Sequence, residues 1–228
     1  MIGSLVKLFW ERPPIDVMEI SFIAKNLLWF FLLLISLSIH EWGHAFVADK
    51  LGDPTPRNLG RVTLNPFAHA DLFGTIIFPL LCIFMSSGIL FGWGRPVPID
   101  VRNFKRPELY TILAGSAGFL GNLLLCLIAS FVLAFGQKYY LIGYSLLELN
   151  ALLIAFNLLP IPGLDGFYLV RYLTKMSDAT VEFLSHWGFF ILLILINVPA
   201  FRTLLSFFIQ KIVVAFIQIS LFLSGLLA

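Results

Sequence analysis

The chain has 228 residues, of which 59% are hydrophobic and only 12% are charged, and its mean hydropathy is +0.94. These values lie far from those of soluble domains, so the composition excludes a soluble globular protein and predicts an integral membrane protein. The formal net charge is only +2, and no basic tract interleaved with aromatic residues suggests nucleic-acid binding.

Apolar stretches long enough to cross a bilayer as helices follow one another along the chain. They cover residues 20–47, 72–92, 109–135, 139–160, 180–199 and 203–227. The polar stretches between them, about 50–71 and 93–108, are too short to fold alone. We therefore expect an all-α polytopic membrane protein with five to six transmembrane helices, one domain over residues 1–228 and extensive contact with the lipid bilayer.

The first apolar stretch ends in the sequence His40-Glu41-Trp42-Gly43-His44. On a helix, residues four apart lie on the same face, so the two histidines can bind one metal ion. Glu41 lies about 100° around the helix from His40, where it can reach a water molecule on that ion, as in the HExxH pattern of zinc hydrolases. The alternative is a pair of interfacial histidines with Glu41 facing the lipid headgroups. The cost of burying ionisable groups in a membrane favours the functional interpretation.

A catalytic zinc site usually needs a third protein ligand and leaves one position open for water. The other histidines are His69 in a polar loop and His186 near a helix start, and acidic residues within apolar stretches are few: Glu41, Glu148 and Asp165. Asp165 stands in NLLPIPGLDGFYLV, where prolines and glycines break the helix. Broken backbone at membrane depth is tolerated only when it is buried in protein or lines a wet cavity. Asp165 is therefore the best candidate for the third ligand.

These residues resemble the site-2 proteases, a family of intramembrane zinc metalloproteases. The family combines HExxH with a downstream NxxPxxxLDG element, and residues 157–166 match that element at every fixed position. The sequence between the two motifs also looks like the small subgroup of the family that lacks an appended PDZ or regulatory domain. The resemblance covers roughly residues 20–175 and departs in one place, where Phe119 replaces the proline of the usual AGPxxN stretch.

The resemblance implies a function and a set of site residues. It implies a zinc-dependent endopeptidase that cleaves transmembrane segments of membrane proteins, in regulated intramembrane proteolysis or in clearance of signal-peptide remnants. The catalytic core would cover about residues 20–175, with accessory helices over 178–228. One zinc ion per chain would be bound by His40, His44 and Asp165, with Glu41 as catalytic base and Asn157 as a polar group that serves the site or the reacting carbonyl.

Two other functions remain possible from the sequence. A divalent-metal transporter could use the same three ligands as a transit site, and a non-catalytic membrane scaffold could keep the metal for binding alone. An intact Glu41 argues against the scaffold, because a scaffold has no use for a base beside the metal. Membrane di-iron desaturases need several histidine boxes, and four histidines in total are too few.

The topology of residues 72–92 follows from the metal site. If this segment crossed the membrane, the HEWGH end of the first helix and Asp165 would lie on opposite faces, and they could not share an ion at distances of about 2 Å. We therefore predict a re-entrant or broken element, with Pro79 and the MSSG sequence at 85–88 as break points. The metal side then holds nine Lys and Arg residues and the other side five. The positive-inside tendency predicts a metal site toward the cytoplasm, in the cell (inner) membrane.

Two further patterns concern helix packing. Ala114, Ala117, Gly118 and Gly121 form a stripe of small residues, which predicts close approach by a neighbouring helix, and we expect that neighbour to be the metal-binding helix. We expect Asn150 to cross-link helices rather than to continue a polar track from Asn157.

Overall fold

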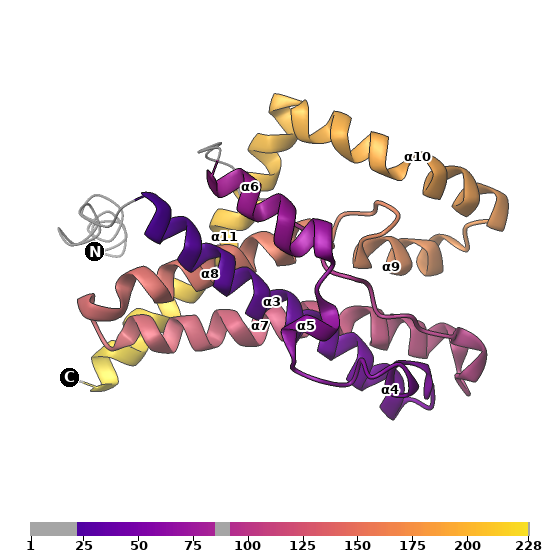
Figure 1. Cartoon of the computed structure of the whole chain (residues 1–228), viewed down its shortest axis with the longest axis horizontal. Helices are drawn as coiled ribbons and strands as arrows, with labels where there is room; N and C mark the ends of the chain where they lie inside the picture. Colours follow the sequence, from indigo (N-terminus) through magenta and orange to yellow (C-terminus); the bar gives the residue numbers. More distant parts are fainter. Residues whose placement is uncertain (1–21, 85–91, 228) are drawn as a thin grey trace.

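The computed structural model describes residues 22–84 and 92–227, and regular structure in this part of the chain is helical apart from one isolated bridge (Figure 1). The longer helices are α3 (Phe22–Lys50), α7 (Pro107–Ala134), α8 (Tyr140–Asn157), α9 (Asp165–Thr174), α10 (Asp178–Asn197) and α11 (Pro199–Leu227). The short elements are α4 (Thr55–Asn58), α5 (Pro66–His69), a π-helical turn at Leu72–Ile77, α6 (Phe78–Phe84) and 3₁₀ turns at Val101–Asn103 and Gln137–Tyr139.

Four described helices are long and apolar enough to cross a membrane. They cover Ala24–Lys50, Pro107–Ala134, Gln137–Asn157 and Pro199–Leu226, and a fifth span is formed if the two halves of α10 are counted together. The structure therefore confirms an all-helical, multi-pass membrane protein, with four to five described spans against the five to six expected.

Helices α3, α7 and α8 pack against one another, with α7 antiparallel to the other two, and the second half of α11 closes the same core (Figure 1). The core is almost entirely aliphatic, so its helices are held by close packing of buried side chains. Its buried members include Leu33, Leu37, Cys126, Ala129, Leu133, Leu147, Ile154, Val213 and Ile217. The start of α3, the α7–α8 connection and the end of α11 lie at one end of the molecule (Figure 1).

The contact between α3 and α7 is unusually close because both helices present glycine. A Cβ atom on Gly43 would lie 2.7 Å from the carbonyl oxygen of Ala117, and one on Gly121 would lie 3.1 Å from the carbonyl oxygen of Ile39. This confirms that the small-residue stripe of α7 faces the HEWGH helix.

The segment that begins at Leu72 does not cross the bilayer. Within the described residues its apolar helix, Leu72–Ile83, has 12 residues, which is about 18 Å of helix against a hydrocarbon core of about 30 Å. The chain then returns to its starting point, because the Trp93 N–H donates to the Gly74 carbonyl (3.1 Å) and the Arg95 N–H donates to the His69 carbonyl (2.8 Å). An antiparallel bridge joins Ala70 to Gly94. The re-entrant element is confirmed, although the MSSG break lies outside the described residues.

The span expected at 180–199 is not straight. The halves Asp178–Gly188 and Phe190–Asn197 meet at an angle of 57°. Gly188 packs against the ring of Pro162, where an added Cβ would lie 3.2 Å from the ring carbons. Glycine is a frequent site of helix kinks, so the bend brings α10 against the segment that precedes Asp165.

Candidate metal centre

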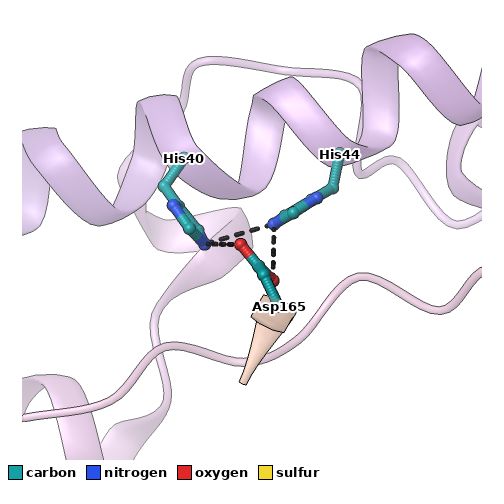
Figure 2. Close-up of side chains that lie close together, drawn as sticks. All are labelled: His40, His44 and Asp165. Atoms are coloured by element: carbon teal, nitrogen blue, oxygen red, sulfur yellow. Dashed lines mark hydrogen bonds and ion pairs between the residues drawn. The ribbon is translucent and has the colours of Figure 1, made fainter. Parts of the chain in front are cut away.

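The side chains of His40, His44 and Asp165 converge on one point although they come from α3 and α9 (Figure 2). One potential ligand atom from each residue lies within 4.8 Å of the other two. The two Nε2 atoms are 3.1 Å apart, and they lie 3.4 Å (His40) and 3.3 Å (His44) from the carboxylate oxygens of Asp165. The third ligand inferred from the broken helix thus lies beside the HEWGH pair.

The histidines are one turn apart on α3, so their rings lie on the same face, and each ring is held from behind by α7. His44 Nδ1 lies 2.7 Å from the carbonyl oxygen of Ala114, and His40 Nδ1 lies 2.8 Å from Oδ1 of Asn122. A backbone carbonyl can only accept, so Nδ1 of His44 carries the hydrogen. In the neutral ring, Nε2 of His44 then carries the lone pair, and this atom faces Asp165, which is the arrangement that binds metal.

Gly118 of α7 lies directly behind both imidazole rings. A Cβ atom at this position would lie 2.6 Å from Cε1 of His40 and still closer to Nε2 of His44. No real Cβ atom tolerates such contacts, so only glycine lets α7 approach the rings closely enough to hold them. The small-residue stripe therefore serves the site as well as helix packing.

Asp165 is delivered by the connection between α8 and α9. α8 ends at Asn157, where two prolines follow, and Gly163 adopts a positive φ of 94° that a glycine accepts without strain. Asp165 is then the first residue of α9. A Cβ on Gly166 would collide with the carbonyl group of Leu158, so the tight return of the chain also needs glycine beside the aspartate.

The donor set fits a divalent cation such as zinc. Oδ2 of Asp165 is buried, and it has no hydrogen-bond partner among the described residues. Buried polar atoms without partners are uncommon, and they indicate an unseen ion or water. Two imidazole nitrogens and one carboxylate oxygen make the three-ligand set of a catalytic zinc site, in which a fourth position stays open.

Glu41 lies beside this group rather than in it, as expected for a base. Its Oε2 atom accepts the backbone N–H of Val97 at 3.1 Å. Gly94 is also close, because a Cβ atom there would lie 3.7 Å from Oε1 of Glu41. The segment that returns from the re-entrant element therefore passes next to the predicted catalytic carboxylate.

Asn157 is the last residue of α8 and is partly buried. Its side chain makes no hydrogen bond within residues 22–84 and 92–227, and it is not part of the metal-binding group. Its role in the reaction stays a prediction.

His69 is fully buried in the loop region. Burial lowers its pKa, and its Nε2–H donates to the carbonyl of Thr63 at 2.8 Å. This contact holds the loop together, and His69 is not part of the metal-binding group.

Three partners of the site were not predicted from the sequence. The Ala114 carbonyl and the Val97 N–H are backbone groups, which carry no sequence signal, and Asn122 lies 82 residues from the histidine it contacts. For Asn122 a signal existed, because it ends the AGFLGN stretch of the resemblance. Asn150 does cross-link helices as expected, since it contacts Asn122 on α7 and Ser36 on α3.

Comparison with known proteins agrees with this geometry. The chain is 37% identical over 185 residues to "Putative zinc metalloprotease YwhC" of Bacillus subtilis, which covers 73% of this chain and 78% of that protein. It is 33% identical to "Putative zinc metalloprotease Rip2" of Mycolicibacterium smegmatis, over 73% of this chain and 65% of the relative. The Rip2 of Mycobacterium tuberculosis is 34% identical over 59% of this chain and 52% of the relative. No protein-family model and no solved structure matches the chain.

Proposed function

Since this chain belongs to the site-2 protease-like family of zinc metalloproteases, we propose that it cleaves transmembrane segments of membrane proteins at a site within the bilayer. The observation that carries the proposal is the meeting of His40, His44 and Asp165 inside a membrane-length helix bundle. His40 lies ten residues before the end of α3, which is about 15 Å of helix and about half of the hydrocarbon thickness.

We assign the roles at the site as follows. His40, His44 and Asp165 hold the ion through Nε2, Nε2 and the carboxylate. A zinc ion held there would supply a Lewis acid that lowers the pKa of a water molecule and polarises the scissile carbonyl. Glu41 takes the proton of that water molecule on its carboxylate and passes it to the leaving amine, and the N–H of Val97 orients the carboxylate. Asn157 donates from its amide to the developing oxyanion.

A substrate helix must open before it reaches these groups. The carbonyls of a helix are already occupied by the N–H groups four residues on, and a bilayer offers no water to replace those bonds. The preferred substrates therefore carry helix-destabilising residues near the cut.

The experiment uses purified protein in liposomes with a single-pass test substrate that carries a Gly-Pro pair within its membrane segment. The wild-type protein is compared with Glu41→Gln and His44→Ala, and zinc content is measured for each. We expect cleavage by the wild type alone, with about one zinc per chain retained in Glu41→Gln and lost in His44→Ala. Cleavage by Glu41→Gln at the wild-type rate would overturn the assigned mechanism, and cleavage only outside the membrane segment would overturn the proposed substrate class.

We also propose that the metal end of the bundle faces the cytoplasm. Seven Lys and Arg residues lie from the end of α3 to the start of α7, and two more lie in α9 and just after it, whereas Lys25 and Lys138 are the described basic residues at the start of α3 and in the α7–α8 connection. Single cysteines at Arg57, whose side chain is 66% exposed, and at Lys138, in the α7–α8 connection, test it in a background without Cys82 and Cys126. An impermeant maleimide added to intact cells should label the second and not the first. The reverse pattern would refute the orientation.

A further inference from the structure

A chain of buried polar side chains leads away from the metal site into the apolar core. Ser36, Asn122 and Asn150 have no exposed surface, and they come from α3, α7 and α8. The amide of Asn150 donates to Oγ of Ser36 at 3.0 Å and accepts from Nδ2 of Asn122 at 3.1 Å, while Oδ1 of Asn122 lies 2.8 Å from Nδ1 of His40. Buried polar groups in a membrane core are costly, so this connected path needs a purpose.

The direction of these hydrogen bonds is fixed at the far end, by a backbone carbonyl. Asn150 also contacts the carbonyl oxygen of Leu146, one turn earlier on α8, at 2.8 Å. A carbonyl only accepts, so the NH₂ group of Asn150 must face Leu146, and its Oδ1 must face Asn122. Because that oxygen also only accepts, Asn122 must present its own NH₂ group to Asn150.

The orientation of Asn122 determines which nitrogen of His40 carries the hydrogen. With its NH₂ group turned to Asn150, Asn122 presents Oδ1 to His40, and the hydrogen of the imidazole must then lie on Nδ1. The Nε2 atom of His40 keeps its lone pair and faces Asp165. Were Asn122 to rotate by a half turn, its NH₂ group would require an unprotonated Nδ1, and the hydrogen would move to Nε2, where it blocks metal binding.

We propose that Asn150 and Asn122 are positioning residues that hold His40 in its metal-binding tautomer. The Leu146 carbonyl fixes the orientation of the Asn150 amide, and Asn150 in turn fixes the orientation of the Asn122 amide that faces His40. His44 needs no intermediate side chains, because the Ala114 carbonyl accepts from its Nδ1–H directly. At His40, α7 presents a side-chain amide, which can face either way, so a second residue must fix its direction. This inference rests on the proposed metal role of His40.

The test measures zinc affinity by chelator competition and the His40 tautomer by ¹⁵N NMR of the metal-free, histidine-labelled protein. Asn150→Leu removes the amide that orients Asn122 and keeps a side chain of similar volume. We expect about tenfold weaker zinc binding and a mixture of Nδ1–H and Nε2–H forms at His40, where the wild type shows Nδ1–H alone. Ser130→Ala is the matched control, because it removes a buried link between α7 and α11 and should change neither quantity.

A double variant separates positioning from folding. Asn122→Asp places a carboxylate beside His40, which accepts from Nδ1–H whichever way it turns. In that background Asn150→Leu should no longer weaken zinc binding or shift the tautomer. An equal loss of zinc affinity in both backgrounds, or a wild type with the hydrogen of His40 on Nε2, would overturn the proposed positioning role. A wild type that binds no zinc would instead refute the proposed function. The two failures can be told apart, because the tautomer is measured on the metal-free protein and does not depend on zinc binding.

Discussion

The two halves of the metal centre are held in different ways. The histidine half lies on a 29-residue helix, and α7 contacts both rings through Gly118, Asn122 and the Ala114 carbonyl. The aspartate half lies at the start of the 10-residue helix α9, and the Asp165 side chain is 18% exposed. The difference teaches that helix packing fixes the histidines, whereas the path of one connecting segment fixes the aspartate.

The largest effect is expected in the histidine half. Gly118→Ala places a methyl group against both rings, so the rings or α7 must move, and we expect zinc affinity to fall by about 100-fold. Gly115→Ala is the matched control, one turn away on α7, because its Cβ would meet its nearest neighbour at 3.9 Å. Chelator competition measures both, and equal affinities in the two variants would break the argument that α7 holds the rings.

The aspartate half should respond more weakly. Gly166→Ala forces the segment from Leu158 away from α9, which displaces Asp165 while the histidines stay in place, so we expect about tenfold weaker zinc binding. Gly163→Ala has open space around its Cβ and strains only the backbone, at a cost of about 1 kcal/mol. That control should lower thermal stability with little change in zinc affinity. If Gly166→Ala costs as much affinity as Gly118→Ala, the two halves are equally constrained and the comparison fails.

The contact between Glu41 and Val97 should affect turnover rather than metal binding. Val97→Pro removes the N–H that orients the carboxylate, and the loss of one such hydrogen bond should lower kcat by about tenfold with zinc content unchanged. Val97→Ala keeps the N–H and should behave as the wild type. Cleavage of the test substrate in liposomes measures both, and a loss of zinc in Val97→Pro would place Val97 with the metal ligands instead.

The smallest effect on the metal centre itself is expected at Asp53, in the loop beyond the end of α3, where a substitution should change stability instead. Asp53 is fully buried and accepts from the Asp100 N–H and from Nδ2 of Asn103. Burial alone would raise its pKa, but these bonds and those from Thr55 outweigh burial and lower it. A lowered pKa means that the stabilisation is complete above the ordinary value of 3.8 and is lost as the pH falls toward the lower, folded-state value.

Asp53→Asn should therefore lower the free energy of unfolding by about 1 to 3 kcal/mol at pH 7. Thermal unfolding at pH 7, 5 and 3 measures the difference from the wild type, which should be equal at the first two values and smaller at the third. A difference that grows on acidification would mean that the carboxylate is not the stabilising form.

The sequence predicts the parts of the molecule that depend on residue type and spacing. The membrane class, the HEWGH pair, Asp165 and the re-entrant element all follow from apolar runs, a four-residue spacing and the need for both ends of the site to meet. The bend of α10 at Gly188 was not predicted, because it depends on contact with Pro162. The contacts of Val97 and Ala114 could not be predicted either, since backbone groups look alike in every sequence.

The most direct test of the metal centre is X-ray absorption at the zinc edge on the purified, zinc-loaded protein. The account predicts a first shell of nitrogen and oxygen at about 2.0–2.2 Å, outer-shell scattering from two imidazoles, and a changed first shell with both imidazoles retained in Asp165→Ala. A shell containing sulfur, or a spectrum that Asp165→Ala leaves unchanged, would contradict it.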